Sequence, residues 1–245
     1  GPPGRRIVLF DYDPSRGGAV PKRLLDGFRG ILLTDGYEAY ANVAGLLGLI
    51  HAGCWAHVRR KFDEARKAQS GLSTTDGHAA AALQMIRELY LIERALWTRD
   101  QPLTAEHRLR VRAELSAPII GKFHAWLEAL MPRVLPQSLL GRAIHYTLGQ
   151  WRKLIVFLEQ GDAPLDNNRC ENAIRPFVLG RKGWLFCDTV KGAIASANMF
   201  SIVETAKANG VEPYAYLSRL FERLPHAKTV EDFEALLPWN VPILS

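Results

Sequence analysis

Apolar positions in the first 55 residues form short continuous runs separated by stretches with helical spacing. The runs at residues 6–10, 31–34 and 46–51 predict three strands, the first of them buried. The apolar spacing of residues 21–30 and 37–43 predicts a helix between each pair of strands. Strands that alternate with helices are typical of an α/β fold.

Residues 58–69 have the pattern of a basic amphipathic helix, and residues 71–77 that of a polar loop. From residue 78 to residue 159 the apolar positions follow only a helical period. Helices are predicted at residues 58–69, 78–96, 104–116, 118–131 and 138–158. Thr104 stands where an N-cap is expected. The sequence therefore predicts a large all-helical insertion within an α/β core.

The pattern after residue 160 indicates further helices. Residues 166–168 are expected to start a helix that Pro176 ends or kinks, with a basic, aromatic loop at residues 179–188. A long helix at residues 191–209 is expected to close at Gly210.

Two shorter helices are predicted beyond it, at residues 213–224 and after the N-cap Thr229. The chain then divides into a first part of the core, an all-helical insertion, core helices and a helical tail. These parts cover residues 1–70, 71–160, 161–210 and 211–245.

Composition adds a preference for an anionic partner. The 245 residues carry a formal net charge of +6, and nucleic acid is the commonest partner of basic domains. The three cysteines show no paired spacing, which argues against a disulfide framework or a cysteine zinc site. No apolar run is long enough for a membrane helix and no signal peptide is visible, so we expect a cytoplasmic protein without a membrane partner.

Asp35 is the first candidate for chemistry. It follows an apolar run at the point where open α/β sheets bind ligands, and Gly36 after it leaves room for a substrate or metal. The alternative is structural, because Asp-Gly after a strand is a common turn signal.

Glu171 is the second candidate, near the start of the helix expected at residues 166–168. With Asn168 as N-cap, a glutamate three residues later resembles a capping box and would be purely structural. However, Arg175, Arg181 and Lys182 follow closely, and a carboxylate amid such positive charge also suits a site for metal and phosphate.

Two basic segments could contact nucleic acid. Arg59, Arg60 and Lys61 at a helix start suit phosphate contacts, although such a charge run is often only a solvated helix face. Trp184 lies beside Arg181 and Lys182 and could stack on an unpaired base, or it could fill the core.

Other chemistries find little support in the sequence. Cys54 and His57 are spaced like metal ligands, but zinc needs a second pair and none is suitably spaced. No serine lies in a G-x-S-x-G context, and there is no glycine-rich phosphate loop.

Taken together, these segments resemble the insertion-sequence-66 family of bacterial transposases. The resemblance runs in order through residues 27–37, 54–62, 165–171, 179–186, 201–211 and 236–240. It implies a DDE transposase with an RNase H-like core, a large all-helical insertion and C-terminal helices.

The resemblance also implies roles for individual residues. Asp35 would be the second catalytic acidic residue and Glu171 the third, both binding two Mg²⁺ or Mn²⁺ ions. Cys54 and His57 would match an auxiliary C-x-x-H signature. Phosphate and base contacts would come from basic and aromatic side chains: Arg59, Arg60, Lys61, Arg175, Arg181, Lys182 and Trp184.

The implied activity is metal-dependent cleavage at transposon ends followed by strand transfer into target DNA. The implied partners are DNA, further copies of the protein and accessory proteins of the same element, at the bacterial nucleoid. Two alternatives remain: an RNase H-like nuclease or resolvase, and an inert DNA-binding module descended from a transposase.

Two departures from the family pattern matter. The family's first catalytic aspartate lies on an upstream strand, so we expect this chain to be catalytically incomplete by itself. We do not assign that role to Asp11 or Asp13, which fall on a later strand. Asn172 stands where relatives often carry arginine, which would remove a phosphate contact.

Overall fold

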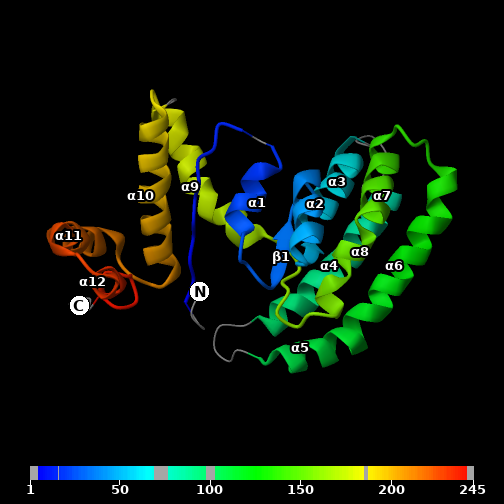
Figure 1. Cartoon of the computed structure of the whole chain (residues 1–245). Coiled ribbons are helices and arrows are strands. Elements are labelled where there is room, and N and C mark those ends of the chain that lie inside the picture. Colours follow the sequence, from blue (N-terminus) through cyan, green and yellow to red (C-terminus); the bar gives the residue numbers. More distant parts are fainter. Residues whose placement is uncertain (1–4, 16, 69–76, 98–102, 185–186, 242–245) are drawn as a thin grey trace. The chain divides into compact units, whose positions relative to one another are not determined.

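A computed structural model describes residues 5–15, 17–68, 77–97, 103–184 and 187–241, with the backbone alone for residues 181–184. The chain divides into two compact units. We call residues 16–168 the sheet unit, and residues 1–15 with 169–245 the tail unit (Figure 1).

The sheet unit holds a small parallel sheet. Strand β1 (Ile31–Thr34) pairs with β2 (Ile50–Gly53), with Ile31 opposite Ile50 and Thr34 opposite Gly53. Helices α1 (Ala19–Leu25) and α2 (Glu38–Leu47) precede the two strands in turn. Because the connection between parallel strands must cross over, α2 and the two strands form a βαβ unit.

The strand expected at residues 31–34 is confirmed, whereas the one expected at residues 46–51 is displaced toward the C-terminus. Leu46 and Leu47 belong to the last turn of α2, which ends at Gly48 with φ +64°. A left-handed residue at this position is a common helix terminator. Among the described residues the fold is mostly helical with this two-stranded sheet, so the RNase H-like core remains a prediction.

Most of the sheet unit is helical, as the apolar period predicted. Helix α4 has the predicted bounds, and Thr104 and Ser138 accept hydrogen bonds from His107 N and Gly141 N as N-caps. The helices are α3 (Trp55–Ala68), α4 (His78–Leu96), α5 (Ala105–Val111), a π-helical turn (Arg112–Ser116), α6 (Ala117–Leu130), α7 (Leu139–Gly149) and α8 (Trp151–Leu154), with 3₁₀ turns at Met131–Arg133 and Val156–Leu158.

Aromatic side chains form the centre of this core. Trp55, Phe62 and Phe123 are fully buried, and the ring centroids of Trp55 and Phe62 each lie about 6 Å from that of Phe123, a separation at which aromatic pairs attract. The Trp55 indole also donates to the carbonyl of Leu154 at 2.9 Å. Since Trp55 directly follows Cys54, this packing fixes the chain where β2 ends.

The tail unit has a second, smaller core around Tyr216 and Leu220. Its helices are α9 (Asn168–Trp184), whose first residue belongs to the sheet unit, α10 (Val190–Ala208), α11 (Pro213–Arg223) and α12 (Val230–Ala235), with a 3₁₀ turn at Leu224–His226. A loop was predicted at residues 179–188. For residues 179–184 this prediction is wrong, because α9 continues through Pro176 and ends at Trp184.

Residues 6–10 do not form the buried strand predicted from their apolar run. Among the described residues they have no strand partner, and Ile7 and Leu9 are 56% and 72% exposed. The segment instead runs beside α10, and polar side chains of α10 and of its C-cap residue bond its backbone. The contacts join Arg6 with Asn209, Val8 with Thr205, and Phe10 with Ser201.

The match between segment and helix has a geometric cause. Two residues of extended chain advance about 6.6 Å, and four residues of an α-helix about 6 Å. Alternate backbone groups of the segment therefore meet every fourth side chain of α10.

No helix in the described ranges is both long and apolar enough to cross a membrane.

Candidate functional site

Asp35 and Cys54 directly follow β1 and β2, respectively. Because the strands are parallel, both residues lie at the carboxyl edge of the sheet, where α/β proteins commonly bind ligands. Asp35 is exposed, and its Oδ1 accepts a hydrogen bond from the Tyr37 backbone at 3.0 Å. One carboxylate oxygen of Asp35 is therefore used in the turn, as the structural alternative predicted. Gly36 lies in this turn with φ +92°.

Tyr146 on α7 supports this turn from the other side. Its hydroxyl donates to the Asp35 carbonyl at 2.9 Å, and a Cβ on Gly36 would lie 3.0 Å from that hydroxyl. Burial, followed by the acidic groups of Cys54 and Asp35, raises the pKa of Tyr146 to about 12. Tyr146 therefore stays protonated and donating; the sequence pattern marked it only as part of a helix.

Cys54 is a buried hydrogen-bond donor. It is 2% exposed, and its Sγ donates to Asn167 Oδ1 at 2.9 Å. Burial raises the pKa of its thiol, against the opposing effect of hydrogen bonds from the backbones of Asn167, His57 and Ala56. In this environment the thiol keeps its proton and can donate to Asn167.

The start of α9 lies at the same edge through Asn167. Asp166 accepts hydrogen bonds from the backbone N–H and the side-chain amide of Asn168, at 3.0 and 2.6 Å. Asn168 is the first residue of α9, and the capping-box interpretation of Glu171 stays a prediction beside the metal-site interpretation. Glu171 itself is half-buried on the first turns of α9, in the tail unit.

Two further side chains adjoin this edge, and neither was singled out from the sequence. Burial, then the charge of Asp166, raises the pKa of Tyr90 on α4, so its phenol stays protonated. His51 Nε2 lies 2.8 Å from Thr34 Oγ1, and burial together with the charge of Lys153 lowers the pKa of His51 to about 4. His51 is therefore neutral at physiological pH.

The predicted phosphate-binding side chains differ in their surroundings. Arg59 and Arg60 are exposed on α3, whereas Lys61 Nζ lies 4.6 Å from the Tyr146 ring centroid in a cation–π contact. Arg175 is exposed on α9. The side chains of Arg181, Lys182 and Trp184 lie outside the described residues.

The donor types suit a hard cation, but the described residues do not assemble a metal centre by themselves. Carboxylate oxygens such as those of Asp35 and Glu171 are the ligands that Mg²⁺ prefers. In the described part of the chain, no three His, Cys, Asp or Glu side chains are grouped so that they could hold a metal ion.

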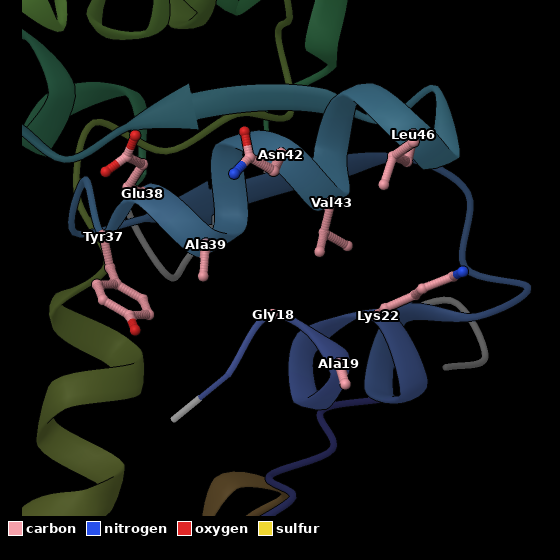
Figure 2. Close-up of a pocket in the computed structure, with 9 residues that line it drawn as sticks. All are labelled: Gly18, Ala19, Lys22, Tyr37, Glu38, Ala39, Asn42, Val43 and Leu46. Atoms are coloured by element: carbon pink, nitrogen blue, oxygen red, sulfur yellow. The ribbon is translucent and has the colours of Figure 1, made fainter. Parts of the chain in front are cut away.

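A shallow groove of about 480 Å³ lies between α1 and α2, and Tyr37 after the Asp35–Gly36 turn contributes to its lining (Figure 2). Figure 2 shows Ala39 and Val43 pointing from α2 toward α1, whereas the carboxylate of Glu38 points away. The lining is largely apolar, and Lys22 contributes a positive charge.

Comparison with known families gives two matches along the chain. The Transposase IS66 family matches residues 2–195, and the IS66 C-terminal element matches residues 201–239. No solved structure matches the chain.

Three curated relatives come from Sinorhizobium fredii. Uncharacterized protein y4jD is 35% identical over 97% of this chain, y4qI 34% over 96%, and y4hP 32% over 95%. These matches cover 46%, 43% and 43% of the respective relatives. The chain thus spans less than half the length of the curated relatives that it matches.

Proposed function

The chain belongs to the Transposase IS66 family, and from that premise we propose that it forms part of the catalytic domain of a DNA transposase. The reaction would cleave phosphodiester bonds at transposon ends and join those ends to target DNA. DNA is therefore the proposed partner, in the cytoplasm of a bacterium, with further copies of the protein and accessory proteins of the element completing the assembly.

The observation that carries the proposal is the composition of the sheet's carboxyl edge. Asp35 follows β1, Cys54 follows β2, and the Cys54 thiol bonds Asn167 directly before α9, the helix of Glu171. Asp35, Cys54 and Asn167, from three separate parts of the sequence, thus lie at the carboxyl edge of the sheet. Such convergence is typical of an active site on an α/β scaffold.

We assign Asp35 and Glu171 as two of the three carboxylates of this site. When bound, two Mg²⁺ or Mn²⁺ ions would supply activation of the attacking oxygen and stabilisation of the leaving 3′-oxygen. Within this chain, the Tyr146 hydroxyl and the turn at Gly36 orient the Asp35 backbone. The neutral thiol of Cys54 and the half-buried His57 support the same edge as auxiliary residues.

The first carboxylate of the set is not assigned to a residue of this chain. In the described residues β1 pairs with β2 alone. On this proposal the chain by itself binds metal weakly and cleaves DNA poorly or not at all.

Basic side chains would hold the DNA backbone. Arg59 and Arg60 are exposed on α3, the helix that starts beside Cys54, and Arg175 is exposed on α9. Such residues position phosphates without reading sequence. Arg181, Lys182 and Trp184 are assigned the same role from the sequence, with Trp184 stacking on an unpaired base.

The test is a cleavage and strand-transfer assay with the complete transposase and labelled transposon-end DNA. Asp35→Asn and Glu171→Gln should each abolish both steps, while Glu38→Gln, a neighbouring exposed carboxylate, should not. Cleavage without joining would indicate a nuclease instead. Full activity of either variant would contradict the assignment, and retained biological effect without catalysis would indicate an inert DNA-binding module.

A further inference from the structure

The helical insertion contains a buried arginine whose contacts converge on one turn of the chain. We propose that Arg112 is a positioning residue: it fixes the course of residues 157–167, here called the approach segment, and so places Asp166 and Asn167 at the sheet edge where α9 begins. The link to DNA cleavage rests on the function proposed above, whereas the positioning itself does not.

Arg112 serves as the hydrogen-bond donor for the turn. Its side chain is 0% exposed; Nη1 donates to the carbonyls of Phe157, Gln160 and Gly161 at 2.8, 3.1 and 3.3 Å, and Nη2 to that of Ala163 at 2.9 Å. Buried carbonyls need such partners. A planar guanidinium therefore sets the backbone path of the first half of the approach segment.

A second buried charge holds the guanidinium in place. Glu93 on α4 accepts from Arg112 Nε and Nη2 at 2.7 Å each, and the Trp97 indole donates to the same carboxylate at 3.0 Å. Burying such a pair is costly, and well-packed apolar residues are often no less stable. The pair is therefore better explained by the geometry it imposes than by net stability.

Arg108 on α5 binds the same turn from one helical turn earlier. Its Nε donates to the Gly161 carbonyl at 2.6 Å, and its Nη2 bonds the Asp162 carboxylate. The turn also lies directly against α5, since a Cβ on Gly161 would collide with the Ala105 carbonyl. Gly161 is thus required by close backbone approach.

The other half of the approach segment is bound to the sheet edge. The Leu165 carbonyl accepts from the Trp55 backbone at 3.1 Å, and Asn167 Oδ1 accepts from Cys54 Sγ at 2.9 Å. The approach segment is therefore held at one end by Arg112 and at the other by the residues after β2. Through these contacts the helical insertion aligns the start of α9 with the sheet.

The test uses Cys54 as a reporter in a Cys170→Ser/Cys187→Ser background. Cys54 is buried partly by its bond to Asn167, so a displaced approach segment should expose its thiol. Arg112→Met should speed Cys54 alkylation about tenfold or more under native conditions, through local opening. Arg112→Lys should fall between, because an ammonium lacks the planar fork.

The matched control is Leu127→Ala, a fully buried core residue of α6, compared at equal loss of unfolding free energy. If Arg112→Met speeds alkylation no more than this control, the positioning role is wrong. If Arg112→Met does not fold, a second experiment takes its place. It measures hydrogen exchange at the Trp55 amide in the Arg108→Met variant, because that amide donates to the Leu165 carbonyl. Faster exchange than in the control supports the proposal, and equal exchange overturns it.

Activity forms a separate arm of the experiment. In the complete transposase, Arg112→Lys should lower kcat for DNA cleavage while leaving KM near its wild-type value, since the DNA-contacting side chains are unchanged. If the Arg112 variants speed Cys54 alkylation but leave kcat unchanged, the positioning role of Arg112 is supported and the proposed function is contradicted. A change in KM alone would contradict a positioning role in catalysis.

Discussion

The thiol of Cys54 donates a hydrogen bond to the side-chain oxygen of Asn167 across 2.9 Å, joining positions 113 residues apart in the sequence. The bond connects the end of β2 with the residue before α9. Burial raises the pKa of this thiol, so the donor proton is retained at physiological pH. Cys54 thus links the end of β2 to the residue before α9.

We expect Cys54 and Asn167 to be energetically coupled. Cys54→Ala and Asn167→Ala should each destabilise the protein, and the double variant should cost less than their sum by about 0.5–1.5 kcal/mol, the usual worth of one hydrogen bond. Urea unfolding of the four proteins measures this coupling. Strictly additive losses would show that the bond contributes nothing, while Cys54→Ser should retain part of it.

Gly36 should tolerate no side chain while Tyr146 keeps its hydroxyl. Gly36→Ala places a Cβ 3.0 Å from Tyr146 Oη in a residue with φ +92°, so we expect a loss of about 1–3 kcal/mol in unfolding free energy. Tyr146→Phe removes the crowding atom but leaves the backbone strain. In that background the cost of Gly36→Ala should fall; an unchanged cost would assign the whole effect to the backbone.

His51 should make stability depend on pH in a defined window. Folding lowers its pKa from 6.5 to about 4, by burial and then by the charge of Lys153. Between these values the unfolded chain binds a proton that the folded protein does not, so the unfolding free energy rises with pH and its full value is present above about 6.5.

The check is urea unfolding of wild type and His51→Gln at about pH 4.5 and pH 7.5, a pair of conditions chosen to span most of this window. The variant should lose less stability on acidification than wild type. His145→Gln, at an exposed histidine of α7, is the control and should follow the wild-type dependence. If His51→Gln and the wild type show the same pH dependence of unfolding free energy, His51 is not the cause of that dependence.

The helices were the part of the fold that the sequence predicted best. Helix α4 has the expected bounds, and Thr104, Ser138 and Thr229 act as N-caps of their helices. Both signals are local, because apolar period and capping chemistry depend on residues within a few positions. Helix α9 was predicted too short because Pro176 was expected to end or kink it and residues 179–188 to form a loop, whereas the helix continues through Pro176 to Trp184.

Residues 6–10 show why apolar runs can mislead. The run predicted a buried strand, but its backbone bonds Ser201, Thr205 and Asn209, whose side chains recur every fourth residue along α10 and its C-cap. These partners lie 191, 197 and 203 positions away in the sequence. No local pattern reveals such a pairing, since an extended segment beside a helix has the same alternation as a strand.

The sequence predicted that Asp35 and Cys54 stand near the ends of strands, but not the contacts that support them. Asp35 and Cys54 stand out because they follow strand-like apolar runs. Tyr146, Asn167 and Arg112 act through tertiary contacts with distant residues, and their own sequence neighbourhoods are those of ordinary helices and loops. The joint use of Asp35 and Glu171 stays a prediction.

The most direct test of that joint use is a Mn²⁺ binding titration, followed by electron paramagnetic resonance, on the complete transposase with Asp35→Asn, Glu171→Gln and both changes together. If the two carboxylates serve one site, each single change should weaken binding by more than about 100-fold, since even outer contacts of a metal site are worth about 10–100-fold. The double variant should then be little worse than either. Independent, additive losses, or an undiminished affinity in either single variant, would contradict a shared site.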